Sequence, residues 1–230
     1  MTFDTLFVRK HAFGTLLGVR IPQTEPSAAE IDTLHPAERE VLEPYRRTRR
    51  GTWVGGRLAL SRACEALGKT DRPLLNDARG APILPAGVVG SLTHKDDIAI
   101  ALVQLTKAPY RLGIDLEKIT HKEPGVGKMV LTEAEMDVYE SLDDYARASF
   151  LIVRFSLKEA IYKALDPFVK RYVGFKEVKI NQNKAGDFTA QFMLKNNEGP
   201  FKAELLSEAL ESDGTGADKH VLSTARIRKQ

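Results

Sequence analysis

The stretch Gly113-Ile114-Asp115-Leu116-Glu117 alternates hydrophobic and acidic side chains. In a β-strand, side chains with this spacing point alternately to opposite faces. Asp115 and Glu117 would then share one face, while Ile114 and Leu116 would be buried on the other. A pair of carboxylates on one face can hold a hard cation such as Mg²⁺. An exposed edge strand with two solvated acids explains the same pattern, so this stretch leaves both interpretations open.

A second stretch, residues 155–165, reads Phe-Ser-Leu-Lys-Glu-Ala-Ile-Tyr-Lys-Ala-Leu. The apolar spacing predicts a helix over 144–165 with one hydrophobic side. Ser156, Glu159 and Lys163 then form one polar stripe along this helix. A Glu-to-Lys pair four residues apart stabilises a helix by about 0.2–0.5 kcal/mol, and this effect alone can explain the stripe. A binding or catalytic site is the alternative interpretation of the same stripe.

A third stretch, Gly90-Ser91-Leu92-Thr93-His94, is expected to end a loop over 77–90, ahead of an apolar strand over 98–105. His94 beside small hydroxyl residues can donate hydrogen bonds to phosphate oxygens. A single histidine is more often structural, so this stretch is weak evidence when taken alone.

The composition indicates a folded protein, because 43% of the 230 residues are hydrophobic and 28% are charged, close to the globular average. No stretch approaches the roughly 18 apolar residues that a membrane span requires, and residues 1–20 lack a secretion signal. We therefore expect a cytoplasmic protein without a membrane partner. The single cysteine, Cys64, is expected to lie in the core.

The net charge of +3 is too small to require a nucleic-acid partner. Basic residues nevertheless gather over 45–62 without an acid among them. A phosphate-bearing ligand explains this cluster, and so does a solvated helix face that pairs with distant carboxylates. The cluster consists of Arg46, Arg47, Arg49, Arg50, Arg57 and Arg62.

The pattern of elements predicts two α+β halves, 1–108 and 109–230, joined at the polar segment 106–110. The first half is expected to contain one or two strands over 2–21, a helical block starting with the capping box Ser27 and Glu30, a main helix over 45–67 and the strand over 98–105. The second half is expected to contain a strand over 111–116, the helix over 144–165 and a strand pair over 173–181 and 188–194. The tail from Ser207 is expected to be a hairpin or a loose loop.

The order of the three stretches resembles the surfactin-type 4′-phosphopantetheinyl transferases. Residues 49–57 read Arg-x-x-x-Trp-x-x-Gly-Arg, and residues 80–93 read Gly-Ala-Pro-Ile-Leu-Pro-Ala-Gly-Val-Val-Gly-Ser-Leu-Thr, which is most similar to the branch that includes the enterobactin synthase transferase component. The resemblance covers residues 34–164. It implies an α+β fold of two similar α/β halves related by a pseudo-twofold, with coenzyme A in the cleft between them.

The resemblance also implies an activity, namely Mg²⁺-dependent transfer of the phosphopantetheine arm of coenzyme A to a serine of an apo carrier protein, with release of adenosine 3′,5′-bisphosphate. By the same resemblance, Asp115, Glu117 and Glu159 would hold Mg²⁺ against the pyrophosphate. Glu159, directly or through water, would accept the serine proton. Lys163 would stabilise the leaving bisphosphate, and Lys158 would assist it.

The first half would bind the adenine and 3′-phosphate of coenzyme A. Arg49, Arg57 and Arg79 are the expected clamp, because guanidinium groups bind phosphate bidentately. Many relatives carry Gly-Lys-Pro where this chain has Gly80-Ala81-Pro82, so Arg79 replaces that lysine or the contact is absent. The residues expected to bind coenzyme A are Arg49, Arg57, Arg79, Gly80, Pro82, Ser91, Thr93, His94, Lys158 and Lys163, and His94 is also expected to be catalytic.

The expected partners are acyl or peptidyl carrier protein domains of polyketide, non-ribosomal peptide or fatty acid synthases, and the chain is expected to be a monomer. His121, Lys122 and Lys128 are candidates to attract an acidic carrier protein, in a segment expected to be a mobile lid. A second class of function stays open, a phosphate- or nucleic-acid-binding protein that uses the arginine-rich helix and does not need the carboxylates.

Overall fold

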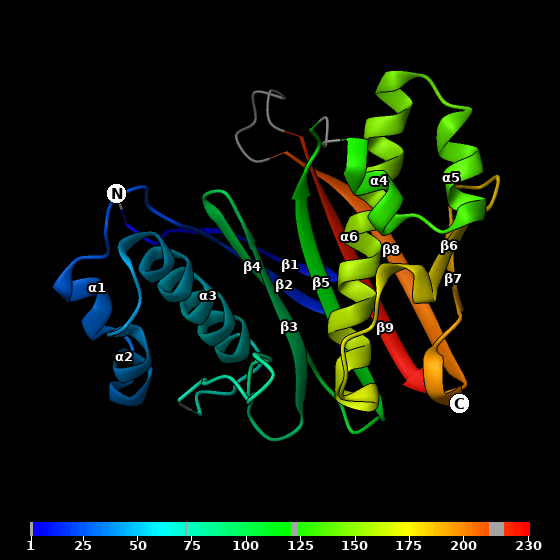
Figure 1. Cartoon of the computed structure of the whole chain (residues 1–230). Helices are drawn as coiled ribbons and strands as arrows, with labels where there is room; N and C mark the ends of the chain where they lie inside the picture. The colour runs from blue at the N-terminus through cyan, green and yellow to red at the C-terminus, as the bar shows by residue number, and fades with distance from the viewer. Residues whose placement is uncertain (1, 72, 121–123, 212–218) are drawn as a thin grey trace. The chain divides into compact units, whose positions relative to one another are not determined.

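The computed structural model describes residues 2–71, 73–120, 124–211 and 219–230. The chain divides into two compact units, unit 1 (Met1–Ala108) and unit 2 (Pro109–Gln230), which Figure 1 colours from blue to green and from green to red. Each unit pairs a long helix with an antiparallel sheet of its own. None of the helices among the described residues has the length and hydropathy that a membrane crossing requires.

Unit 1 contains a four-stranded antiparallel sheet with the order β1-β2-β4-β3. The inner strand β4 is buried from Ile98 to Val103, as its unbroken apolar sequence predicts. It pairs with β3 over the full length of both strands. The strands of this sheet are β1 (Thr5–His11), β2 (Gly14–Arg20), β3 (Val88–Lys95) and β4 (Ile98–Leu105).

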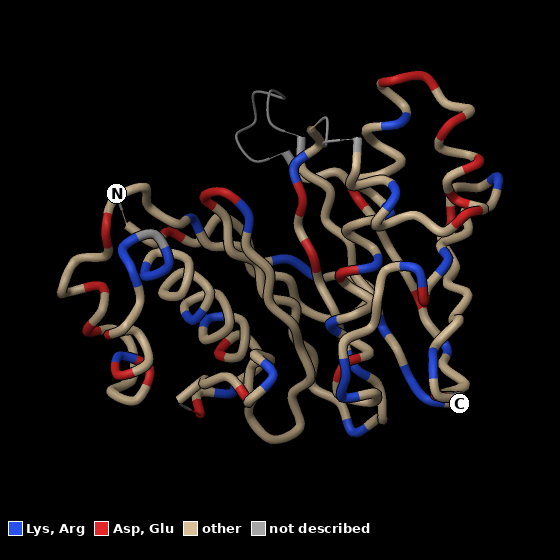
Figure 2. The backbone as a smooth tube through the Cα atoms, viewed as in Figure 1, with Lys and Arg blue, Asp and Glu red and all other residues tan. Residues whose placement is uncertain are grey.

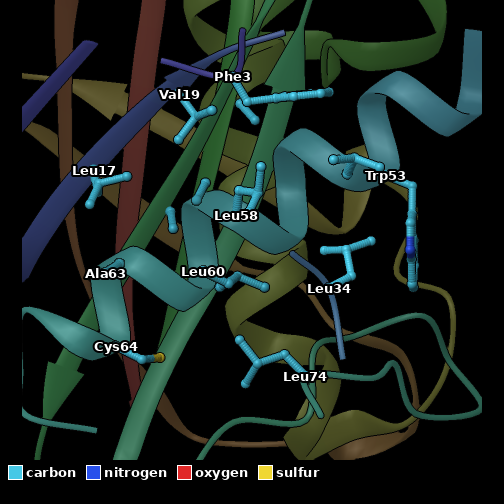
Figure 3. Close-up of a cluster of buried hydrophobic side chains, with 14 of the residues drawn as sticks. Phe3, Leu17, Val19, Leu34, Trp53, Leu58, Leu60, Ala63, Cys64 and Leu74 are labelled. Atoms are coloured by element: carbon cyan, nitrogen blue, oxygen red, sulfur yellow. The ribbon is translucent and has the colours of Figure 1, made fainter. Parts of the chain in front are cut away.

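The long helix of unit 1, α3 (Arg47–Glu65), packs on this sheet. It starts shortly after Pro44 and ends before Gly68, whose φ of +72° is a conformation that glycine adopts without strain. Figure 3 shows Leu60 and Cys64 of this helix within the cluster of buried hydrophobic side chains that forms the core of unit 1. Cys64 is buried, as predicted from the sequence.

Two short helices precede α3, and each begins with a capping box. Ser27 caps α1 (Ala28–Asp32), and the Glu30 carboxylate accepts a hydrogen bond from the Ser27 N–H at 2.8 Å. His35 caps α2 (Pro36–Leu42), and the Glu38 carboxylate accepts from the His35 N–H at 3.1 Å. Both helices lie in the block that the sequence predicts to be helical.

Unit 2 contains a three-stranded antiparallel sheet with the order β5-β9-β8. Its strands are β5 (Tyr110–Lys118), β8 (Phe201–Glu211) and β9 (Lys219–Lys229). The long helix α6 (Asp144–Val169) packs against β5 and β9. A separate hairpin consists of β6 (Val178–Gln182) and β7 (Phe188–Phe192).

Shorter helices complete unit 2. They are α4 (Pro124–Val130) and α5 (Glu133–Glu140), which precede α6, and two single 3₁₀ turns, η1 (Phe175–Glu177) and η2 (Lys195–Asn197). Val130 and Leu131, at the end of α4, are buried in a small cluster with Leu151 of α6. This cluster packs the end of α4 against α6.

The α+β class predicted from the sequence is confirmed, whereas the pseudo-twofold relation stays a prediction. Several local predictions are wrong. Gly90 to His94 belong to strand β3 and not to the end of a loop, and Ser207 lies inside strand β8 and not in a loose tail. The strand predicted over 173–181 begins only at Val178, after η1. Lys128 of the predicted lid lies in helix α4, and His121 and Lys122 are outside the described residues.

Candidate active site

Two of the stretches singled out in the sequence meet in unit 2, where α6 crosses β5. The Lys163 ammonium donates hydrogen bonds to Asp115 Oδ1 at 3.0 Å and to the Ile114 carbonyl at 2.8 Å. Asp115 is buried, with 6% of its surface exposed. The strand thus carries the carboxylate and the helix carries the cation, as the alternation on β5 and the polar stripe on α6 predict.

The second oxygen of Asp115, Oδ2, is buried and has no hydrogen-bond partner among the described residues. A buried carboxylate oxygen without a donor is costly, because the desolvation of its charge is not compensated. Such an oxygen is suited to a ligand that brings positive charge. Asp115 therefore combines one oxygen neutralised by Lys163 with one that is available to a cation.

Glu159 lies on the same side of α6 and is half-buried. Burial raises the pKa of Glu159 above its ordinary value of 4.5, and the negative charges of Asp115 and Glu117 raise it further, against the opposing effect of Lys163. A bound divalent cation would relieve this repulsion among three carboxylates. In the described part of the chain, no three His, Cys, Asp or Glu side chains already form a metal-binding cluster. The fit to Mg²⁺ therefore rests on the unpartnered oxygen of Asp115 and on the charge around Glu159.

Replacing Glu159 with glutamine is expected to raise the melting temperature at neutral pH. A carboxyl whose pKa is higher in the folded state disfavours folding once the pH rises above its unfolded pKa, and the effect is complete above the folded pKa. The difference between variant and wild type should therefore vanish below about pH 4 and grow as the pH increases. Thermal unfolding from about pH 4 to about pH 8 measures it. A difference that does not change with pH would contradict the charge argument.

A pocket of about 170 Å³ adjoins Glu159. Its walls come from one side of α6 and from the segment that leads into β6, and they are mainly aromatic and aliphatic. The rings of Tyr162 and Tyr172 pack 5.9 Å apart, centroid to centroid. The lining residues are Lys158, Glu159, Ile161, Tyr162, Tyr172, Val173, Gly174, Phe175 and Val178.

Ion pairs hold the outer wall of this pocket. Arg171 Nη2 lies 2.7 Å from a carboxylate oxygen of Glu177 and 2.6 Å from one of Glu198. Hydrogen bonds from Arg171 lower the pKa of Glu177 to about 2. These ion pairs fix both ends of the segment that contains Tyr172. The position of this pocket wall is therefore defined by contacts within unit 2.

The structure gives Lys158 a different environment from the one expected. The Lys158 ammonium is buried and donates to Glu135 Oε2 at 2.6 Å and to the Val130 carbonyl at 2.8 Å. Its charge is thus matched inside unit 2, which argues against the predicted assistance at the pyrophosphate. Glu135 is absent from the residues predicted from the sequence. The spacing Thr132-x-x-Glu135 signals a helix start but not a partner on another helix.

Arg57 also differs from its prediction as part of a phosphate clamp. Its guanidinium is buried, donates to the Leu74 carbonyl and to Asn76 Oδ1, the latter at 3.0 Å, and stacks over the Trp53 ring at 4.3 Å. Arg57 therefore anchors the segment after α3 to that helix. Arg49 is exposed and lies over the Tyr45 ring at 4.7 Å, so its position is compatible with binding an external anion.

Other basic residues surround the start of α3, as Figure 2 shows. Arg47 and Arg50 lie 3.6 and 3.7 Å from carboxylate oxygens of Glu25. This acid comes from outside the basic stretch and offsets part of its charge. The alternative of a helix face paired with a distant carboxylate is thus correct for these two arginines.

The loop with Arg79, Gly80 and Pro82 is a compact turn. The Arg79 N–H donates to Asp77 Oδ1 at 2.8 Å, and Gly80 has a φ of +88°. An isolated antiparallel β-bridge pairs Pro82 with Asn76. The Arg79 side chain is exposed on this turn.

Strand β3 presents the three remaining candidates on different faces. Ser91 and Thr93 are buried, with 5% and 4% of their surface exposed, whereas His94 is exposed. This follows from the period of two in a strand. The side chain most accessible to a phosphate is therefore that of His94.

Comparison with known proteins assigns both units to one family. A family model described as the 4′-phosphopantetheinyl transferase N-terminal domain matches residues 37–104, and one described as the 4′-phosphopantetheinyl transferase superfamily matches residues 111–225. The 4′-phosphopantetheinyl transferase Npt of Nocardia iowensis is 33% identical over 180 residues, which are 78% of each chain. The 4′-phosphopantetheinyl transferase PptT of Mycobacterium tuberculosis is 30% identical over 162 residues, 70% of each chain.

Among solved structures, the ACPS–CoA complex of Chronobacterium ammoniagenes aligns with 18% identity and a TM-score of 0.41, over 54% of this chain and 99% of that chain. The family assignment rests on the sequence matches, which extend over both units. The chain belongs to the 4′-phosphopantetheinyl transferase superfamily.

Proposed function

We propose that this protein transfers the 4′-phosphopantetheine arm of coenzyme A to a serine hydroxyl of an apo carrier protein and releases adenosine 3′,5′-bisphosphate. The observation that carries the proposal is the junction of β5 and α6, where Asp115 has one oxygen on the Lys163 ammonium and one buried oxygen without a partner among the described residues. This junction falls inside the matched superfamily region. The alternative of a nucleic-acid-binding protein gives no account of the buried carboxylate.

Each residue of the junction has a distinct part in the proposed reaction. Asp115, Glu117 and Glu159 would hold Mg²⁺, which when bound would neutralise negative charge on the pyrophosphate. The serine oxygen forms a bond to the phosphorus that carries the pantetheine arm, and the bond from that phosphorus to the bridging oxygen breaks. Lys163, held by Asp115, is placed to donate to the phosphate oxygens of the leaving group.

Glu159 is the proposed acceptor of the serine proton, directly or through a water molecule. A proton acceptor need only lie within hydrogen-bond reach of the serine hydroxyl, and Glu159 lines the pocket next to the junction. The pocket that adjoins Glu159 offers an apolar surface to the part of the substrate next to the reacting atoms. Proton acceptance and substrate positioning would thus occur at one turn of α6.

Unit 1 is proposed to bind the adenosine 3′-phosphate end of coenzyme A. Arg49 and Arg79 are exposed cations, and His94 is an exposed imidazole. Arg57 is assigned to holding the segment at Leu74 in place. The partners would be acyl or peptidyl carrier domains of polyketide, non-ribosomal peptide or fatty acid synthases. The monomeric state, the cytoplasmic location and the enterobactin-type branch stay predictions.

The proposal is tested by the intact mass of apo carrier proteins from the three synthase classes after incubation with coenzyme A and Mg²⁺. We expect a gain of one phosphopantetheine arm on at least one carrier, and no gain when EDTA replaces Mg²⁺. Glu133→Gln, which removes an exposed carboxylate on α5, serves as a control and should match wild type. No gain on any carrier, or full modification in EDTA, would overturn the proposal.

A further inference from the structure

A buried ion pair lies one residue away from Glu159. Glu135 Oε2 accepts hydrogen bonds from the Lys158 ammonium at 2.6 Å and from the Thr132 N–H at 2.8 Å, and Glu135 Oε1 accepts from the Ile180 N–H at 2.7 Å. Lys158 also donates to the Val130 carbonyl at 2.8 Å. The pair therefore joins the end of α4, the start of α5, strand β6 and helix α6.

The burial of this pair is nearly complete, since 1% of the Lys158 side chain and 2% of the Glu135 side chain are exposed. A buried ion pair rarely stabilises a protein more than well-packed hydrophobic residues would, because both charges lose their hydration. What such a pair supplies is a defined geometry. Here that geometry fixes the residue that precedes Glu159.

A second buried cation depends on Glu135. Arg154, one turn before Lys158 on α6, is buried and stacks on the Phe150 ring at 3.2 Å. Burial lowers the pKa of Arg154 to about 10, and the charge of Glu135 opposes this effect. Loss of the Glu135 charge would leave both cations uncompensated in this part of α6.

Unit 1 contains a similar arrangement, in which the residue that follows the buried cation is not acidic. Glu38 occupies the same capping-box position at the start of α2, is fully buried, and accepts from the Leu74 N–H at 2.7 Å. Arg57, from the long helix α3, donates to the carbonyl of the same Leu74. The residue after Arg57 is Leu58, whereas the residue after Lys158 is Glu159. The two glutamates are therefore a matched pair for experiment.

We propose that Glu135 is a positioning residue for the transfer reaction and that, through Lys158, it holds the turn of α6 that carries Glu159. This inference rests on the proposed function. Glu135 does not touch the substrate; it sets the placement of Glu159 relative to Asp115 and of the pocket wall at β6. Its loss should therefore lower kcat more than it changes the affinity for coenzyme A.

The first test compares Glu135→Gln with Glu38→Gln. We expect Glu135→Gln to lower kcat by at least about 10-fold, as loss of a supporting contact to a catalytic group does, with KM for coenzyme A changed by less than about twofold. Glu38→Gln should lower the melting temperature similarly while keeping kcat at saturating substrate. Equal losses of kcat in the two variants, or unchanged kcat in Glu135→Gln, would overturn the proposal.

A double variant separates positioning from stability. Glu135→Gln with Lys158→Met removes both charges of the pair, which should recover part of the melting temperature lost in the single variant, while Arg154 stays uncompensated. The hydrogen bond to Val130 is not recovered, so kcat should stay at least about 10-fold low. Return of kcat to the wild-type value would show that the pair contributes only stability and would overturn the proposal.

Hydrogen–deuterium exchange gives a readout that does not need activity. Glu135→Gln should speed amide exchange in residues 156–163, and Glu38→Gln should not. If wild type modifies no carrier protein, the transfer function fails, and the exchange result alone decides the placement of α6. Unchanged exchange in this segment of Glu135→Gln would contradict the proposed positioning.

Discussion

Gly113→Ala is expected to destabilise unit 2 severely. A Cβ at this position would lie 1.8 Å from the Ala160 carbonyl oxygen and 3.0 Å from the Ala164 nitrogen. Both are backbone atoms of α6, so relief requires the helix to move away from β5. The cost should exceed about 3 kcal/mol, the upper end for ordinary overpacking. Urea unfolding followed by circular dichroism would measure it.

Gly125→Ala is the matched control for this prediction. Gly125 lies in α4, and a Cβ added there would meet no atom of the described residues within 4 Å beyond its own stretch of helix. Alanine favours a helix over glycine by about 1 kcal/mol, so this variant should be as stable as wild type or slightly more stable. A Gly113→Ala protein with wild-type stability would show that β5 and α6 can separate without loss of the fold.

Glu159→Gln is expected to lower kcat by about 10²–10³-fold, the usual loss when a charged group that stabilises a transition state is removed. The glutamine can neither accept the serine proton nor contribute charge to the proposed Mg²⁺ site. The same variant should melt at a higher temperature at neutral pH, as argued above. Loss of activity together with a gain in stability would separate a role in catalysis from a role in folding.

The measurement is the initial rate of carrier protein modification at saturating coenzyme A, with Glu133→Gln as the control for loss of a carboxylate in the same unit. If Glu159→Gln kept more than about half of the wild-type activity, Glu159 could be neither the proton acceptor nor a metal ligand.

Elements with a strong hydrophobic period could be predicted from the sequence. Strand β4 has the predicted bounds, because its side chains are apolar on both faces and all are buried up to Val103. Helices α3 and α6 were predicted to within a few residues, because each presents one apolar side to a sheet. Strand β5 could be predicted for a similar reason, since its core residues alternate with the acids.

Strand β8 could not be predicted, and the reason lies in its exposure. Among its residues up to Leu210, only Leu205 is buried. Glu204 and Glu208 interrupt the hydrophobic pattern, and neighbouring Leu205 and Leu206 fit a helix as well as a strand. At the edge of a sheet, backbone pairing decides the conformation, and such pairing leaves little trace in the sequence.

The candidate site was predictable only in part. The placement of Asp115 and Lys163 on a strand and a helix follows from local periods, but their contact depends on the packing of α6 on β5. The expectation that these two residues share one site came from the resemblance to a family. The same resemblance suggested a ligand role for Lys158, whereas the structure pairs it with Glu135, a contact between residues distant in sequence that no local pattern specifies.

The pairing of β5 with β9 has a consequence for biosynthesis. Among the described residues, strand β5 is paired with β9 alone within its sheet, from Tyr110 opposite Arg228 to Lys118 opposite His220. On the ribosome, the strand with Asp115 emerges long before its neighbour is made. Until Lys219–Lys229 has been translated, this strand has an open edge that other chains can bind. Unit 1 pairs β2 with β4 within its own residues and can fold during that wait.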